Sequence, residues 1–101
     1  MPGVVVCGAM GRMGRAILGI LKEGPHGLSL SGAVEAAGHP LLSQDAFEAA
    51  GAGRAGVPVT DDFAKAVAAA DVAIDFTGAD SSARNAWAAA AAGKPIVIGS
   101  T

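Results

Sequence analysis

The chain has 101 residues, of which 51% are hydrophobic and 16% are charged, and its formal net charge is −2 at pH 7. This length suits one compact domain, and the apolar fraction is too high for a disordered chain. The mildly acidic balance, without a run of Lys or Arg, argues against nucleic acid or an anionic membrane as the main partner. A single Cys, no signal-peptide pattern and no apolar stretch near the roughly 20 residues of a spanning helix predict a cytoplasmic domain.

A strand and a helix open the chain. Residues 3–7 contain a β-branched run that stops at Gly8, which is typical of a strand buried on both faces of a parallel sheet. The next apolar positions recur at i, i+4, i+7 and i+8 and predict one face of a helix, formed by Met13, Ile17, Ile20 and Leu21. Gly24-Pro25 predicts the end of this helix, and residues 28–34 alternate apolar and polar as in a second strand.

Strand and helix patterns continue to alternate. The predicted elements are a short helix at 45–50, an edge strand at 57–59, a helix from the cap residues 60–62 to 70, a strand at 72–76, an Ala-rich helix carrying Trp87 and capped by Asp80-Ser81-Ser82, and a buried-type strand at 96–98. The Gly/Ala-rich residues 51–56 are expected to be mobile. Alternation of this kind predicts βαβ units and a doubly wound parallel sheet in three α/β/α layers. Because the last strand is of a buried type, we expect this domain to be one part of a longer protein.

The segment between the first strand and the first helix is Gly8-Ala9-Met10-Gly11-Arg12-Met13-Gly14. In a dinucleotide-binding loop, Gly8 takes the dihedrals of the tight turn, Gly11 admits the pyrophosphate, and Gly14 lets the helix pack closely on the strand. Free N–H groups at the helix N-terminus then face the phosphates. The spacing is G-x-x-G-x-x-G, so the alternative is a glycine-rich turn of any α/β protein. The position of the loop favours nucleotide binding and a Rossmann fold, and no Gly-Lys-Ser/Thr follows, which argues against a phosphate-loop NTPase.

Glu35 ends the second strand, roughly 20 residues after Gly14, where an acidic side chain can accept hydrogen bonds from the adenosine ribose. The alternative is an ordinary surface glutamate. Ala36 and Ala37 follow it, so no adjacent base is available for the 2′-phosphate of NADPH. Only Arg12, on the same rim, could offset the repulsion between Glu35 and that phosphate. The sequence therefore predicts NADH or NADPH as cofactor, with NADH favoured.

Other polar residues give weaker signals. Asp75 closes a strand on the cofactor side of the sheet and is either a loop-stabilising carboxylate or a ligand. Cys7 is expected to be a small core residue, and Arg15 to lie on a solvated helix face. His26 and His39 lie in loops without metal-ligand spacing and are expected to be solvated. The sequence contains no zinc pattern, no nucleophile elbow and no general acid–base pair, so it predicts neither a metal site nor a catalytic residue.

The glycine loop, with its Gly-Arg-Met-Gly continuation, resembles the N-terminal domain of the dihydrodipicolinate reductase (4-hydroxy-tetrahydrodipicolinate reductase) family of bacterial lysine and diaminopimelate biosynthesis. Further segments occur in that family's order and spacing, nearly end to end: Ala33-Val34-Glu35, Gly51-Ala52-Gly53, Gly56-Val57, Ile74-Asp75-Phe76-Thr77 and Lys94-Pro95-Ile96-Val97-Ile98-Gly99. Each segment alone is modest, and together they are specific.

The resemblance implies a reductase that takes hydride from NADH or NADPH. By this resemblance the cofactor-binding residues are those of the glycine loop, the ribose-binding acid and the two loops at the nicotinamide end: Gly8, Ala9, Met10, Gly11, Arg12, Met13, Glu35, Phe76, Thr77, Gly99, Ser100 and Thr101. Two departures stand out. Family members that use NADPH well often carry Arg where this chain has Ala36, and the family's usual Gly-Thr-Thr is Gly99-Ser100-Thr101 here.

The resemblance also implies that residues 1–101 are the dinucleotide-binding domain alone. In the family, the catalytic His and Lys and most tetramer contacts lie in a second, C-terminal domain, so no catalytic residue is assigned here and the domain alone is expected to be inactive. Two alternatives are the cofactor domain of another two-domain oxidoreductase, such as an oligosaccharide-type or aspartate dehydrogenase, and a non-catalytic nucleotide-sensing module. The Arg12-Met13-Gly14 and Asp75-Phe76-Thr77 segments argue against the first alternative.

Overall fold

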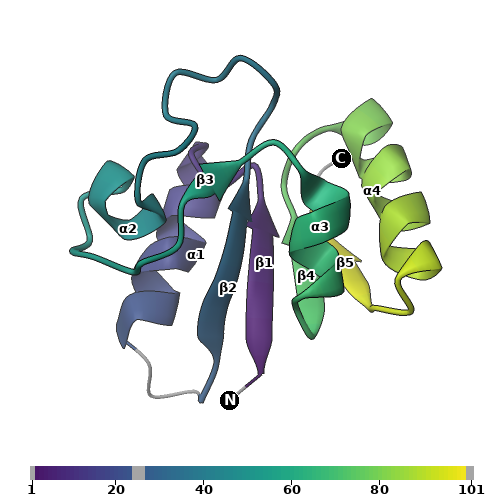
Figure 1. Cartoon of the computed structure of the whole chain (residues 1–101), viewed down its shortest axis with the longest axis horizontal. Helices are drawn as coiled ribbons and strands as arrows, with labels where there is room; N and C mark the ends of the chain where they lie inside the picture. Colours follow the sequence, from purple (N-terminus) through teal and green to yellow (C-terminus); the bar gives the residue numbers. More distant parts are fainter. Residues whose placement is uncertain (1, 24–26, 100–101) are drawn as a thin grey trace.

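The computed structural model describes residues 2–23 and 27–99, in which five parallel strands form one sheet in the order β3-β2-β1-β4-β5 (Figure 1). The strands are β1 (Gly3–Cys7), β2 (Ser29–Val34), β3 (Val59–Thr60), β4 (Val72–Asp75) and β5 (Ile96–Ile98). The helices are α1 (Arg12–Glu23), α2 (Ala46–Ala49), α3 (Phe63–Ala68) and α4 (Ala79–Ala91). The chain builds outward from β1 in one direction and then in the other, which confirms the predicted doubly wound sheet and opens a crevice where the strand order reverses.

The two faces of the sheet each carry a separate core. In β1, Val4 and Val6 belong to the core under α1 and α2, whereas Val5 and Cys7 belong to the core under α3 and α4. All four side chains are fully buried, as the β-branched run predicted for a strand covered on both faces. Figure 1 shows helices on both sides of the sheet, so the three-layer prediction is confirmed.

The strand register brings the ends of three strands to one edge of the sheet. Cys7 of β1 pairs with both Val34 of β2 and Asp75 of β4. The residues that follow these three positions in the chain therefore lie side by side at the carboxyl ends of the strands, and they are Gly8, Glu35 and Phe76. This register determines where the candidate site lies.

The Ala-rich helix begins earlier than predicted. Its N-cap is Gly78, which has no side chain to cap the helix, and Asp80-Ser81-Ser82 lie within the first turn of α4, so the predicted cap is wrong. The early start of α4 is explained by contacts between this helix and the end of β4. The carboxylate of Asp75 accepts hydrogen bonds from the N–H of Thr77 (2.8 Å) and from the side chain of Asn85 (3.2 Å), which ties the start of α4 to the end of β4.

The last strand is also more exposed than its sequence predicts. Val97 is 61% exposed and Ile98 is 44% exposed, because β5 pairs only with β4 in the described part of the chain. Trp87 on α4 is 80% exposed. The prediction of a strand buried like β1 is therefore wrong for these residues. Within residues 2–23 and 27–99, no helix is long and apolar enough to span a bilayer.

A single carboxylate holds the end of the Gly/Ala-rich segment that the sequence predicted to be mobile. Asp45 accepts hydrogen bonds from the N–H groups of Ala55 (2.9 Å), Gly56 (2.6 Å) and Val57 (3.2 Å), and it also caps α2 through the N–H of Glu48. These bonds, led by the one from Ala55, lower the pKa of Asp45 below its usual value of 3.8. The segment is thus anchored before it enters β3.

We expect Asp45→Asn to lower the urea midpoint of unfolding at neutral pH and to flatten its pH dependence in acid. A lowered folded-state pKa contributes stability that is complete above the unfolded-state value and is lost as the pH falls through the folded one. The measurement is urea unfolding followed by circular dichroism between about pH 2 and pH 7, since an unfolded Asp titrates near pH 3.9. Asp61→Asn is the matched control, because Asp61 is exposed and makes no hydrogen bond among the described residues. Equal acid profiles for the two variants would contradict the role of Asp45.

Candidate functional site

The loop after β1 is a tight turn that requires glycine at its first position. Gly8 has φ +75°, a left-handed conformation, and its N–H donates to the carbonyl of Val34 at 2.9 Å. A Cβ on Gly8 would lie 3.1 Å from the carbonyl oxygen of Phe76. The turn therefore packs between the ends of β2 and β4.

The other two glycines of the loop differ sharply in their surroundings. A Cβ on Gly14 would lie 2.7 Å from the Cα of Ala9 and closer still to the carbonyl oxygen of Gly8. At Gly11 the nearest atom to such a Cβ is the Gly8 carbonyl oxygen, at 3.3 Å, and Gly11 is exposed. Gly14 is thus needed for packing α1 on the loop, and Gly11 leaves backbone open toward solvent.

Arg15 is exposed, as the sequence predicts for a solvated helix face, and it also stabilises the loop. Its Nε donates to the carbonyl oxygen of Met10 at 2.8 Å. This bond joins a side chain in the first turn of α1 to the backbone of the glycine loop. The guanidinium therefore satisfies a carbonyl group that the turn leaves without a backbone partner.

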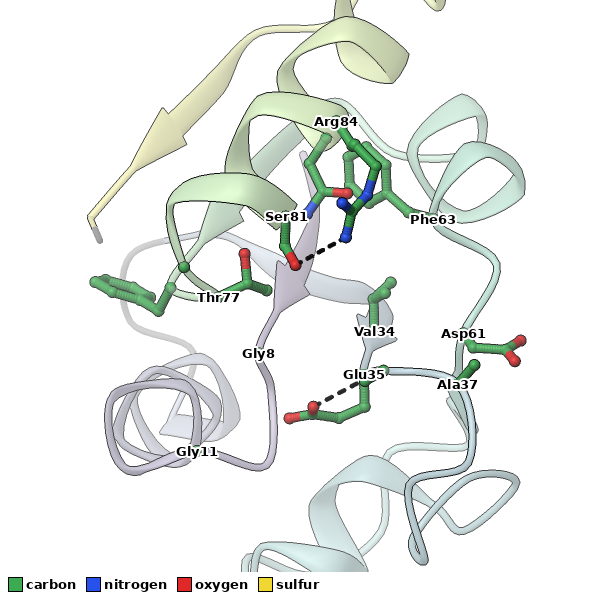
Figure 2. A pocket seen from close by; sticks show the side chains of 14 residues that line it. Gly8, Gly11, Val34, Glu35, Ala37, Asp61, Phe63, Thr77, Ser81 and Arg84 are labelled. Carbon is green, nitrogen blue, oxygen red and sulfur yellow. Dashed lines mark hydrogen bonds between the residues drawn. The ribbon is translucent and has the colours of Figure 1, made fainter. Parts of the chain in front are cut away.

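The carboxylate of Glu35 lies against the glycine loop. Its Oε2 accepts from the N–H of Met10 at 2.7 Å, and its Oε1 accepts from the N–H of Ala36 at 3.3 Å. Figure 2 shows Glu35 at the rim of the pocket, on the side of the loop that holds Gly8 and Gly11. The long second bond leaves one carboxylate oxygen available to further donors.

A pocket of about 560 Å³ lies between the glycine loop, the end of β2 and the start of α4 (Figure 2). Five of the predicted site residues line it: Gly8, Gly11, Glu35, Phe76 and Thr77. Residues that the sequence analysis did not assign to the site also line it: Val34, Ala36, Ala37, Asp61, Phe63, Gly78, Ser81, Arg84 and Asn85. The spacing of Ser81, Arg84 and Asn85 on one helix face could have indicated this side of the pocket.

Five further predicted site residues among those that the structure describes lie outside the lining of this pocket. Ala9 and Met10 have buried side chains in the core under α1, whereas Arg12 and Met13 are exposed. Gly99 packs against the ring of Phe76, and its N–H donates to the carbonyl of Asp75 at 2.8 Å. Ser100 and Thr101 lie outside the described residues, as does His26.

Asp75 is fully buried and stabilises the loop, which was one of its two predicted roles. Besides the bonds already described, it accepts from the hydroxyl of Thr77 at 2.7 Å. Burial, with the negative charges of Asp75 and Glu35, raises the pKa of Cys7 to about 12. A thiol of this kind is a core residue and not a nucleophile, as predicted.

His39 is not simply solvated. Its Nδ1 accepts a hydrogen bond from the N–H of Leu41 at 3.1 Å, so it stabilises a turn in the segment after β2. Within residues 2–23 and 27–99, no cluster of His, Cys, Asp or Glu has the composition of a metal site.

Residues 3–101 match the family described as "Dihydrodipicolinate reductase, N-terminus". The chain belongs to this family. The 4-hydroxy-tetrahydrodipicolinate reductase of Anaeromyxobacter dehalogenans (strain 2CP-1 / ATCC BAA-258) is 54% identical over the whole chain, which covers 37% of that protein. The enzyme of the same name from Geobacter metallireducens is 48% identical, again over the whole chain and 37% of the relative. The chain therefore spans little more than a third of the length of these reductases.

Solved structures share the fold of this dihydrodipicolinate reductase domain. An amine dehydrogenase from Mycobacterium smegmatis superposes with a TM-score of 0.81 at 23% identity, over 96% of this chain and 29% of that one. A structure titled RSP in complex with β-NAD⁺ and operator DNA superposes with a TM-score of 0.72 at 17% identity, over 100% of this chain and 51% of that one. At these identities the likeness shows a shared Rossmann fold. Membership of this family argues against the cofactor domain of a different oxidoreductase family.

Proposed function

We propose that this domain binds NADH or NADPH as the cofactor half of a 4-hydroxy-tetrahydrodipicolinate reductase. The observation that carries the proposal is the convergence of the Gly8–Gly11 turn and the Glu35 carboxylate on one open pocket. A helix N-terminus with exposed backbone suits a pyrophosphate, and a carboxylate with a weakly bonded oxygen suits ribose hydroxyls. The same pocket lies at the switch point of the sheet, where doubly wound folds bind ligands.

In this proposal the predicted residues fall into groups, and each group binds or positions one part of the cofactor. Gly8 and Gly11 shape the phosphate site, with Arg12 and Met13 at the start of α1 supplying N–H groups, and Ala9 and Met10 anchor the turn in the core. Glu35 holds the adenosine ribose. Phe76 and Thr77, together with Gly99, Ser100 and Thr101, are assigned to the nicotinamide end. When bound, the cofactor supplies the hydride, and the chain's own residues orient it.

We place the substrate, a cyclic dicarboxylate imine, the catalytic residues and the tetramer contacts in the rest of the full-length protein. The isolated chain is then expected to bind NADH without oxidising it when the substrate is added. Calorimetry with NADH, followed by a single-turnover assay of NADH absorbance, tests both parts. The full-length relative from Anaeromyxobacter dehalogenans is the positive control for the chemistry. Oxidation by the isolated chain at a rate near that of the control would contradict the assignment.

We expect NADH to bind more tightly than NADPH. A carboxylate at Glu35 gains charge-assisted hydrogen bonds from two ribose hydroxyls, and the same carboxylate repels the roughly two negative charges of a 2′-phosphate. At an exposed pocket the difference is on the order of 1 kcal/mol, a several-fold preference that narrows as salt is raised.

Titration of both cofactors at low and high salt measures this preference. Glu35→Gln keeps an oxygen for the Met10 N–H, so it removes the charge without removing the acceptor of the loop bond. Glu35→Gln with Ala36→Arg adds a bidentate phosphate donor and is expected to shift the preference toward NADPH. Tighter binding of NADPH by the unmodified chain would show that attraction between a basic side chain and the 2′-phosphate exceeds the repulsion from Glu35.

A further inference from the structure

The pocket contains one cation that the glycine-loop pattern does not account for. Arg84 lies in the second turn of α4, and Figure 2 shows its guanidinium reaching over the pocket from the side opposite Glu35 and Ala37. It is the only basic side chain among the residues that line the pocket. Its Nη2 donates to the hydroxyl of Ser81 at 3.2 Å, and no carboxylate of the described residues lies within ion-pair distance of it.

Two apolar side chains, Val34 and Phe63, line the pocket near this guanidinium (Figure 2). Val34 and Phe63 are both buried at the pocket wall, and across from Arg84 the chain continues from Glu35 into two alanines, Ala36 and Ala37. The alanine methyl groups are too short to fill the space. The pocket therefore offers a slot with Val34 and Phe63 on its wall, two small residues on one side and a planar cation on the other.

A dinucleotide bound as proposed would place its adenine in this slot. With the pyrophosphate at the glycine loop and the adenosine ribose at Glu35, the next group outward from the loop is the base. A purine is planar and mostly apolar on its faces, and a guanidinium stacks on such a face without needing a carboxylate partner. A 2′-phosphate suits the slot less well, because its charge would lose hydration over Val34 and Phe63 and would lie near the Glu35 and Asp61 carboxylates.

We propose that Arg84 binds the adenine base of the cofactor by stacking, with Ser81 orienting the guanidinium. This inference rests on the proposed function. Because stacking acts on the base, which NADH and NADPH share, the loss of Arg84 weakens both cofactors to the same extent. Because stacking needs the guanidinium plane, a lysine of equal charge does not replace it.

The test is calorimetric titration of NADH, NADPH and ADP-ribose against the unmodified chain, Arg84→Ala and Arg84→Lys. We expect Arg84→Ala to weaken all three ligands about five-fold and Arg84→Lys to weaken them nearly as much. Arg54→Ala is the matched control. It removes an exposed charge that pairs with Glu48 away from the pocket, and it should leave all three affinities unchanged.

Three results would overturn the proposal. Unchanged NADH affinity in a folded Arg84→Ala variant would show that Arg84 does not touch the cofactor, while the proposed function would stand. A loss confined to NADPH and restored by Arg84→Lys would assign the cation to the 2′-phosphate. No binding of NADH by the unmodified chain would overturn the proposed function and this inference together. Thermal unfolding of each variant, expected to match the unmodified chain, separates these results from loss of fold.

Discussion

Gly14→Ala is expected to destabilise the domain by about 3 kcal/mol, near the upper end of the cost of overpacking. The added Cβ would lie 2.7 Å from the Cα and carbonyl carbon of Ala9. These are backbone atoms in a turn that the Val34 carbonyl holds through the N–H groups of Gly8 and Ala9, so they cannot move aside without breaking those bonds. Urea unfolding followed by circular dichroism measures the effect.

The matched control for Gly14→Ala is Gly19→Ala in the same helix. No atom outside the immediate helix lies within 4 Å of a Cβ at Gly19. This substitution gains the roughly 1 kcal/mol of helix propensity that separates alanine from glycine. The two variants should therefore shift the unfolding midpoint in opposite directions. If both stabilise the domain, the close approach of α1 to the glycine loop does not exist in solution.

Gly11→Val is expected to abolish most cofactor binding while leaving the domain folded. The branched side chain would stand where the phosphates approach the exposed backbone of the loop, and a cost of about 3 kcal/mol would weaken Kd roughly 100-fold. The fold tolerates it better than a change at Gly14, because the nearest atom to the new Cβ is the Gly8 carbonyl oxygen at 3.3 Å. NADH titration and thermal unfolding of the same sample measure the two effects.

Gly11→Ala supplies the graded control, since it adds one methyl group and should weaken binding less than valine does. Unchanged NADH affinity in folded Gly11→Val would mean that the phosphates lie elsewhere. Equal stability losses for substitutions at Gly11 and Gly14 would also contradict the distinction drawn here between a glycine that faces the ligand and one that faces the helix packing.

Local patterns in the sequence were sufficient for the parts of the fold that depend on neighbouring residues. The β-branched run predicted β1, the spacing of apolar residues predicted that α1 is a helix, and the glycines between them predicted a turn. The predicted apolar face of α1 is partly wrong, because Met13 and Ile20 are exposed and Leu18 is buried beside Leu21. Glu35 could be placed because a strand of the right length ends just before it. These features follow from side-chain period and backbone freedom, which are properties of short segments.

Only the tertiary structure decided the rest, because the deciding contacts join a side chain in one element to a group in a different element or loop. Asp45 bonds to Ala55 and anchors the Gly/Ala-rich segment, and Asp75 bonds to Asn85 at the early start of α4. Arg15 bonds to the glycine loop and stabilises its turn. No local sequence pattern predicts any of these three contacts. Arg84 reaches the pocket only because β4 lies beside β1 in the sheet. Strand order and register are set by packing of the whole domain, and they determine which side chains share a pocket.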